Sequence, residues 1–471
     1  MNIRRPISIA LLVVAGLTLS AAQPSTQARR ASDIPQLTFE KITLPNGLEV
    51  ILSPKRGLPM VAVNLWYHVG PAHEAVGRTG FAHLFEHMMF QSSKHVPEDS
   101  HFKLLEAAGA SDINGTTGND RTNYFQTVPS NQLELALWLE SDRMGYLLEK
   151  VTQTSLANQQ DVVRNERRQS VENQPYGMAE EALVQLLYPA GHPYYGNVIG
   201  SHEDIQAVKL EDVQNFFKQY YAPNNASLAI VGDIDVAATK ALVQKYFSTL
   251  KRGAPVPKIS ATTPKITAER RKVVPSRVEL PRVYMAWHSP AMFADGDAEM
   301  DLFGDLLANG KTSRLYRTLV YERRIAVDVS AYQGSRELAG FFLVAATAAP
   351  GQSLTDIATA IDSELHAVIN DGPTEAEMQR AAAQVEAHFL YRLQTVGGFG
   401  GKSDQLNAYN VFCGDPAYFS QDLTRYTSAT RESVQAAAAR LLRVDARVVL
   451  SVVPNGQPAL ALAGSEPVSV S

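Results

Sequence analysis

Hydrophobic and polar residues follow two different periods along the chain, and the two periods take turns. Runs in which apolar and polar residues alternate, or in which nearly all residues are apolar, indicate strands, whereas apolar residues three and four positions apart indicate helices. The predicted strands are 37–44, 48–52, 61–67, 110–117, 122–128 and 226–232. The predicted helices are 81–90, 102–108, 132–148, 155–171 and 210–221. This mixture predicts an α/β or α+β fold.

A second series of strands and helices begins near Arg270 and ends at Pro454. The stretch 251–267 between the two series is polar, carries Pro and Ala and has no clear period, which is typical of a linker. A chain of 471 residues is also too long for one hydrophobic core. We therefore expect an N-terminal domain and a homologous C-terminal domain. The predicted segments are 36–250, the linker 251–267, the second domain 268–455 and a loose tail 456–471.

One predicted helix, 81–90, carries three residues of metal chemistry. At about 3.6 residues per turn, His83 and His87 lie one turn apart on one face, where two imidazoles can bind the same metal ion. Glu86 flanks that face and could reach a water without being a ligand. An ordinary surface or core pair of His is the alternative. The apolar neighbours predict a largely buried helix, in which such polar groups are costly unless they are paired or bind a metal.

A catalytic zinc usually has three protein ligands and an open position for water, so a third ligand must come from elsewhere. The charged helix 155–171 offers Glu166, which we take as the first choice. On spacing alone, Asp161 or Glu172 could serve as well. A helix of this composition is more often a solvent-exposed surface, so the residues by themselves leave the choice open.

The two series also match each other, which indicates a duplication. The helix that contains Val213 is followed by strand 227–231, and the helix that contains Val434 is followed at the same distance by strand 448–452. The apolar positions of 82–89 also match those of 300–307, and the three chemical positions there become Asp301, Gly304 and Asp305. One interpretation is a duplicated unit of which only the first copy kept a metal site; the alternative is chance similarity of amphipathic helices.

These motifs resemble those of the pitrilysin-type zinc peptidases, or inverzincins, and most of all the two-domain half-enzymes related to mitochondrial processing peptidase. The resemblance rests on His83 to His87, on Asn165 to Arg168, on 114–124 and on 192–200, and it extends from about Leu37 to Pro454. It implies two similar domains, each a mostly antiparallel sheet with helices on one side. It also implies one Zn²⁺ held by His83, His87 and Glu166, with Glu86 as the general base that activates the zinc-bound water.

The resemblance assigns the substrate site as well. The segment Asn114, Gly115, Thr116 and Thr117 would be an edge strand to which a peptide substrate adds as a further strand. Without the resemblance, an ordinary Gly- and Thr-rich hairpin would be the preferred interpretation. The family often has another Glu seven residues before its ligand Glu, and this chain has Gln159 there, which bears on the groups that polarise the ligands.

One departure from the family concerns the second half. Active members carry an Arg and, about seven residues later, a Tyr that hold substrate and stabilise the oxyanion. Val320 and Val327 occupy those positions here, and Arg314 and Tyr321 have the right spacing six residues too early. We therefore expect a zinc metalloendopeptidase subunit whose partner, a second pitrilysin-like chain, supplies Arg and Tyr in a heterodimer. A homodimer, and a non-catalytic structural or assembly subunit, are the alternatives, whereas a simple metal carrier would not explain Glu86.

The N-terminus predicts export. Arg4 and Arg5 precede a short apolar stretch, 7–19, and small residues follow at 20–22, as in a signal peptide 1–22. An uncleaved anchor and a twin-arginine signal are the alternatives, and 23–35 is polar and expected to be disordered. We expect a periplasmic or secreted bacterial protein without a membrane span in the mature chain. The formal net charge of −5 argues against nucleic-acid binding, and the single Cys413 excludes an intrachain disulfide.

Overall fold

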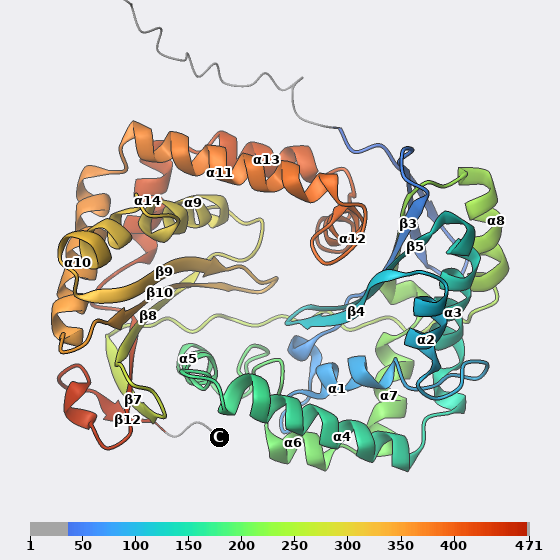
Figure 1. The fold of residues 1–471 in the computed structure, drawn as a ribbon, viewed down its shortest axis with the longest axis horizontal. Helices are drawn as coiled ribbons and strands as arrows, with labels where there is room; N and C mark the ends of the chain where they lie inside the picture. The colour runs from blue at the N-terminus through green and yellow to red at the C-terminus, as the bar shows by residue number, and fades with distance from the viewer. Residues whose placement is uncertain (1–35, 469–471) are drawn as a thin grey trace, which may run out of the picture. The chain divides into compact units, whose positions relative to one another are not determined.

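The computed structural model describes residues 36–468, so the predicted signal peptide 1–22 and the segment 23–35 lie outside the described residues. Two six-stranded sheets organise the described part (Figure 1). The first sheet has the order β1-β2-β6-β3-β5-β4, in which β2 and β6 are parallel and the other neighbours are antiparallel. Its strands are β1 Glu40–Thr43, β2 Glu49–Pro54, β3 Met60–Tyr67, β4 Ser111–Gly118, β5 Arg121–Pro129 and β6 Ala226–Gly232. Strand β4 therefore forms one edge of this sheet.

The second sheet repeats this arrangement with the order β12-β7-β11-β8-β10-β9. Its strands are β7 Arg270–Ser276, β8 Arg282–Ser289, β9 Ala326–Gly334, β10 Gly340–Ala348, β11 Val448–Pro454 and β12 Glu466–Pro467. In both halves the last long strand lies between the first and the second long strands, and the third long strand lies at an edge. The predicted fold of two similar, mostly antiparallel sheets with packed helices is confirmed. The shared topology supports the duplication.

Helices lie between the strands in both halves. The first half has α1 Phe81–Met88, α2 Ser100–Ala107, α3 Leu133–Tyr146, α4 Gln153–Arg167, α5 Ala179–Leu187, α6 His202–Ala207, α7 Leu210–Tyr220 and α8 Val236–Phe247. The second half has α9 Asp297–Ala308, α10 Leu354–Asp371, α11 Glu375–Gln394, α12 Lys402–Cys413, α13 Phe419–Thr427 and α14 Arg431–Leu441. Helix α9 follows β8 as α1 follows β3, so the helix of the metal motif has its counterpart at the position that the sequence match indicated.

One helix of each half also packs against the sheet of the other half. Helix α12 of the second half lies against the first sheet, where the buried Asp404 accepts hydrogen bonds from Trp66 Nε1 at 2.8 Å and from Asn123 Nδ2 at 2.8 Å. Helix α5 of the first half packs its Leu183 and Leu187 into one apolar cluster with strands of the second sheet. The boundaries 36–250 and 268–455 stay a prediction, since these two helices join the halves.

The structure corrects the prediction that the C-terminal segment is a loose tail. Residues 455–468 lie against the second sheet, where β12 pairs in parallel with β7 and Leu462 is buried. The Leu462 N–H donates to Ser451 Oγ, which fixes the segment. The segment consists mostly of small and polar residues with one buried apolar side chain, Leu462. A single buried residue produces no hydrophobic period from which a packed segment could be predicted.

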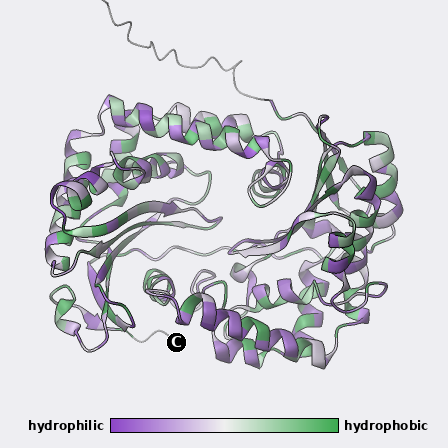
Figure 2. Cartoon of the chain, viewed as in Figure 1, coloured by the Kyte–Doolittle hydropathy of each residue, from purple (hydrophilic) through white to green (hydrophobic). Residues whose placement is uncertain are grey.

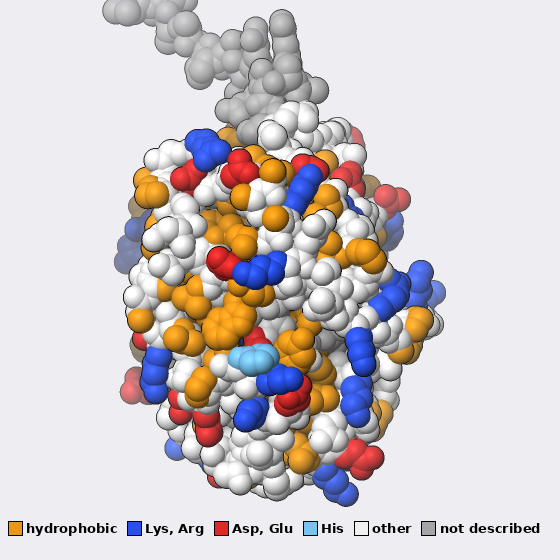
Figure 3. Space-filling model, turned by 90° about the vertical axis from the view of Figure 1, so that its right-hand side faces the viewer, with side chains coloured by type: hydrophobic (Ala, Val, Ile, Leu, Met, Phe, Trp, Pro, Cys, Tyr) orange, Lys and Arg blue, Asp and Glu red, His pale blue; other side chains and the backbone are white. Residues whose placement is uncertain are grey.

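Polar, charged and hydrophobic residues are mixed over the surface of the described residues. Figure 2 shows hydrophobic and hydrophilic residues intermixed along the helices around the sheets, with α4 mostly hydrophilic. On the face that Figure 3 shows, basic and acidic side chains are interspersed with separate groups of hydrophobic ones. Within residues 36–468, every helix is too short or too polar for a bilayer crossing.

Candidate metal centre

Helix α1 holds its polar residues on a scaffold that is packed into the core of the first half. Leu84, Phe85 and Met88 are fully buried there. Burial of each such side chain contributes roughly 1.5–3 kcal/mol to the free energy of folding. The start of the helix has no side-chain cap of its own. Instead, the Glu74 carboxylate accepts hydrogen bonds from the Gly80 and Ala82 N–H groups at 3.2 and 2.7 Å. These two hydrogen bonds hold the N-terminal end of α1 against Glu74.

Helix α4 brings a carboxylate to the two imidazoles of α1. Glu166 Oε2 lies 3.3 Å from His87 Nε2 and 3.9 Å from His83 Nε2. The two rings are 4.8 Å apart between centroids and nearly perpendicular. One ligand atom from each of the three residues lies within 4.8 Å of the others, so they could hold one metal ion. The structure thus brings together the three residues proposed as ligands.

The geometry and the donor set fit zinc. Zinc bonds of about 2.0–2.1 Å in a tetrahedral arrangement put ligand atoms about 3.3 Å apart, close to the His87–Glu166 separation. Two imidazoles with one carboxylate are also a common donor set for catalytic zinc. Burial, and then the neighbouring His87, lower the pKa of His83, which favours the neutral ring that can bind a metal. The hydrogen bond from His87 lowers the pKa of Glu166, so its carboxylate is ionised.

Glu86 lies beside this group as a buried carboxylate with one fixed hydrogen bond. Thr117 Oγ1 of β4 donates to Glu86 Oε2 at 2.5 Å. Burial raises the pKa of Glu86, while the Thr117 hydrogen bond and the charge of His87 oppose that shift. A carboxyl whose pKa lies above its usual range is a better proton acceptor when ionised, as a general base requires. Thr117 was predicted only as part of the substrate strand, and its contact with Glu86 is a feature that the sequence did not indicate.

Strand β4 approaches α1 so closely that one position requires Gly. A Cβ at Gly115 would lie 2.9 Å from Glu86 Oε1 and 2.9 Å from Phe90. The predicted segment 114–117, α1 and α4 line a cavity of about 770 Å³. Since β4 is an edge strand, one of its sides is unpaired in the sheet. The structure therefore places the predicted substrate segment at the cavity that contains Glu86.

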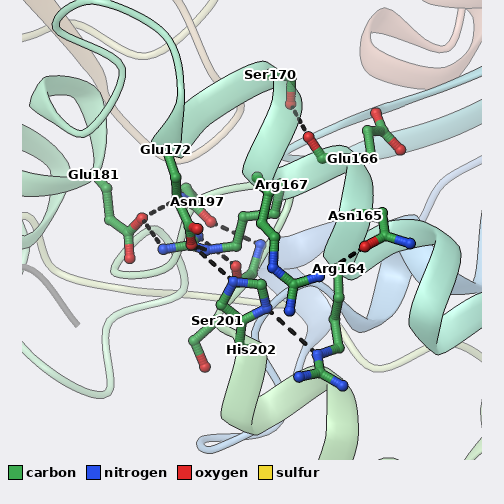
Figure 4. A network of polar contacts seen from close by, with 12 residues as sticks. Arg164, Asn165, Glu166, Arg167, Ser170, Glu172, Glu181, Asn197, Ser201 and His202 are labelled. Carbon is green, nitrogen blue, oxygen red and sulfur yellow. Dashed lines mark hydrogen bonds and ion pairs between the residues drawn. The ribbon is translucent and has the colours of Figure 1, made fainter.

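A buried ion-pair network holds the end of α4. Arg167 Nη2 contacts Glu181 Oε2 of α5 at 2.9 Å, Arg167 Nε contacts Glu172 Oε1 at 3.0 Å, and Arg167 Nη1 donates to the Gly200 carbonyl at 2.5 Å. Figure 4 shows these side chains on one side of the helix, with the Glu166 carboxylate directed away from them. The sequence pattern did not indicate this positioning role, although Arg167 directly follows Glu166. A charged helix residue carries no signal that it is buried.

The alternative ligands lie in other environments. The exposed Asp161 is 3.6 Å from Arg164, and Glu172 contacts His202 Nε2 at 2.8 Å besides Arg167. Gln159, which stands where the family often has Glu, is buried, lines the cavity and forms a hydrogen bond with His87. An amide therefore takes the place of a carboxylate next to the imidazole of His87, a candidate ligand.

The counterpart helix α9 carries a different polar group. Asp301, at the position that matches His83, accepts a hydrogen bond from Tyr426 Oη at 2.6 Å. Burial, and then the charge of Asp297, raise the pKa of Asp301 to about 7. Asp305, which matches His87, is half-buried, and Gly304 offers no side chain at the position of Glu86. The second half thus has no equivalent of the imidazole pair on this helix.

Asp301 leads to a prediction about stability. A carboxyl whose pKa rises on folding binds its proton more tightly in the folded state, so stability falls as pH rises from about 4 to about 7. Asp301→Asn cannot titrate and should remove this loss. We expect the variant to gain about 1–3 kcal/mol of unfolding free energy at about pH 8 and much less at about pH 5.

Urea unfolding at both pH values measures this difference, with the exposed Asp161→Asn as the control substitution. A gain that is the same at both pH values would contradict the role of Asp301 titration.

Four residues of the second half bear on the family's Arg and Tyr. Arg314 Nε and Nη2 contact the two carboxylate oxygens of Glu377 at 2.6 and 2.7 Å, so this guanidinium is engaged within the second half. Tyr321 is 72% exposed and Val327 is 46% exposed, while Val320 is partly buried against the core. None of these four residues lines the cavity of the metal centre.

Comparison with known proteins matches both halves of the chain. The model for the insulinase family, peptidase family M16, matches residues 49–192, and the model for the peptidase M16 inactive domain matches residues 207–385. The chain is 29% identical over 368 residues to zinc protease PqqE of Helicobacter pylori, which covers 77% of this chain and 82% of that protein.

Solved structures of similar fold include proteases. A protease from Helicobacter pylori superposes with a TM-score of 0.83 and 26% identity over 89% of this chain and all of that one. The first half of the periplasmic protease PqqL from Escherichia coli has the same fold, with a TM-score of 0.74 and 19% identity over 91% of this chain and 95% of that one. From its two matched domains, its relatives and its fold, the chain belongs to peptidase family M16, the insulinase and pitrilysin-type family.

Proposed function

We propose that this chain is a zinc metalloendopeptidase subunit that hydrolyses peptide bonds in peptides or unfolded segments. His83, His87 and Glu166 would hold the zinc, and Glu86 would act as the general base. The observation that carries the proposal is the meeting of the three ligand atoms beside the buried carboxylate of Glu86, in a cavity bordered by an edge strand. Relatives named as zinc proteases support it.

Each residue has a separate task. Zinc held at this site would polarise the scissile carbonyl and make an attacking water more acidic. Glu86 takes the proton from that water and passes it to the leaving amine, which needs an ionised carboxylate at the start of the cycle. The hydrogen bond from Thr117 keeps one oxygen of Glu86 in place, and the network around Arg167 keeps α4 in the orientation that directs Glu166 to the imidazoles.

The edge of β4 supports an extended peptide as the substrate. A peptide that pairs with 114–117 uses backbone hydrogen bonds, so affinity does not demand one sequence. The absence of a side chain at Gly115 lets the backbone lie against Glu86 and Phe90. The scissile bond would then lie over α1, within reach of the general base.

A partner subunit is part of the proposal. Val320 and Val327 stand where active family members carry Arg and Tyr, and Arg314 is paired with Glu377. Without these groups, the oxyanion has fewer donors in this chain. We propose that a second pitrilysin-like chain supplies them in a heterodimer, with a homodimer as the alternative. The structure of PqqL in which one half resembles this chain supports an arrangement of paired halves.

A non-catalytic structural or assembly subunit is the second candidate function. The match of residues 207–385 to a domain named inactive favours it for the second half. The ligand group and Glu86 in the first half favour the enzyme. The predicted signal peptide and the periplasmic relative PqqL support a periplasmic location.

The test measures metal and hydrolysis on the same purified chain. We expect about one zinc per chain, weak cleavage of unstructured peptides by the lone chain and a gain of roughly 10²-fold or more when the partner subunit is added. Metal analysis and a quenched-fluorescence peptide assay provide the two readouts. Turnover by the lone chain in the usual range of roughly 1–10³ s⁻¹ would contradict the heterodimer. A chain that binds no zinc would support the non-catalytic alternative.

A further inference from the structure

A second cavity of about 320 Å³ lies beside the metal centre, between α5 and the second sheet. It shares four lining residues with the larger cavity: Ser170, Val171, Gly177 and Glu180. Ser170, Val171 and Gly177 come from the segment that joins α4 to α5, after Glu166, and Glu180 lies in the first turn of α5. The two cavities are therefore neighbours across one short stretch of chain.

The walls of this second cavity are apolar and come from both halves. Helix α5 provides Leu183, Val184 and Leu187, and strands β8 and β10 provide Ala286 and Leu343. Each of these five residues is at most 5% exposed, so their positions are set by the core. A site of this kind is preformed, which lowers the entropic cost of binding an apolar group.

The segment between the two cavities has a demanding backbone. Tyr176 adopts φ 61°, which is uncommon for a bulky residue. Its hydroxyl donates to the Leu280 carbonyl at 2.8 Å, and its ring lies under the Arg282 guanidinium at 3.8 Å. A Cβ at Gly177 would lie 1.9 Å from the Val171 carbonyl oxygen. Contacts with the second half thus hold this segment in a conformation that keeps the wall between the cavities thin.

Charge at the rim narrows the choice of occupant. Glu180 lines the cavity and would repel an acidic side chain. The apolar walls would leave a charge of either sign without hydration. The volume lies at the lower limit of small-molecule pockets, roughly 300–1,000 Å³, and so suits one large side chain.

We propose that this second cavity is a specificity subsite that binds one large apolar side chain, aromatic or long aliphatic, of the peptide whose scissile bond lies at the metal centre. The inference rests on the proposed peptidase function and adds a substrate class to it. Peptides with such a residue at one fixed distance from the cleaved bond would be preferred, because the two cavities adjoin at the four shared residues and a single bound peptide could reach both.

The experiment measures peptide binding, so it does not depend on turnover. A single Phe is moved one position at a time through an otherwise Ala- and Ser-rich fluorescent peptide, and anisotropy reports its binding to the zinc-loaded full chain. We expect one position at which Phe binds about tenfold or more tightly than Ala. Val184→Phe, which fills the cavity, should reduce the preference for Phe over Ala from tenfold to between about onefold and threefold. Leu183→Ala, which enlarges the cavity, should shift the preference toward Trp.

Leu186→Ala is the matched control, since Leu186 lies on the same helix and lines a different cavity. Zinc content and the thermal midpoint are measured for every variant, so misfolding is recognised. A Phe preference that is unchanged in both Val184→Phe and Leu183→Ala, or the lack of any preferred position, would overturn the subsite. If the variants change the Phe preference but the chain with its partner cleaves no peptide, the subsite is supported and the peptidase function is contradicted. If the chain cleaves peptides but the variants leave the Phe preference unchanged, the peptidase function is supported and the subsite is contradicted.

Discussion

Glu86→Gln is expected to keep zinc bound and to lower turnover by roughly 10²–10⁴. The substitution preserves the size of the side chain and leaves the amide oxygen able to accept from Thr117, so the cavity should keep its shape. An amide cannot accept the proton from the attacking water. The loss should therefore appear in kcat, with peptide binding little changed.

The measurement compares kcat and zinc content under the conditions in which the parent chain is active, with the partner present if it is required. Glu203→Gln, an exposed Glu on α6, controls for the loss of one negative charge. If Glu86→Gln retains zinc and turns over within a few-fold of the parent, Glu86 is not the general base.

Removal of a ligand is expected to remove both zinc and activity. His87→Ala, His83→Ala or Glu166→Gln should each yield chains that no longer hold stoichiometric zinc, because two ligands rarely retain a catalytic zinc ion. Glu166 receives this role from its position, with its carboxylate 3.3 Å from His87 Nε2. Its two rivals on the same segment should behave differently. Asp161 faces solvent, and Glu172 is paired with Arg167 and His202.

Metal analysis after dialysis against a weak chelator gives the zinc content of each variant. Asp161→Asn is the matched carboxylate-to-amide control and should stay close to one zinc per chain. Glu172→Gln tests the second rival and also removes one partner of Arg167. If Glu166→Gln keeps its zinc while one of these two loses it, the third ligand has been assigned wrongly.

Local pattern was sufficient for the strands of the first sheet, for five helices of the first half and for the imidazole pair. The spacing of His83 and His87 within an apolar helix sets their common direction, since helix geometry alone relates residues four apart. The same reasoning identified the counterpart helix α9 with Asp301, and the strand order of the two sheets supports that match. The sequence patterns failed at the tail, where Leu462 is a single buried anchor without any period.

Tertiary structure decided which carboxylate reaches the imidazoles. Helix α4 is mostly hydrophilic, so its pattern marks no buried face from which the direction of Glu166 could be read (Figure 2). That direction comes from Arg167, which is buried because Glu181 and the Gly200 carbonyl meet it from other parts of the chain. Residue type and spacing along one helix cannot encode partners that arrive from elsewhere.

The same limit applies to the exchange of helices between the halves. The sequence patterns did not predict α5 or α12, and the buried residues of α12 are mostly polar, so no apolar stripe marks the sheet against which it packs. Asp404 on α12 finds its donors, Trp66 and Asn123, on strands of the other half. The sequence by itself determined the strands of the first sheet, the helix of the metal motif and the chemistry that this helix carries. Only the tertiary structure decided which elements meet, because packing and buried hydrogen bonds depend on shapes that distant segments form together.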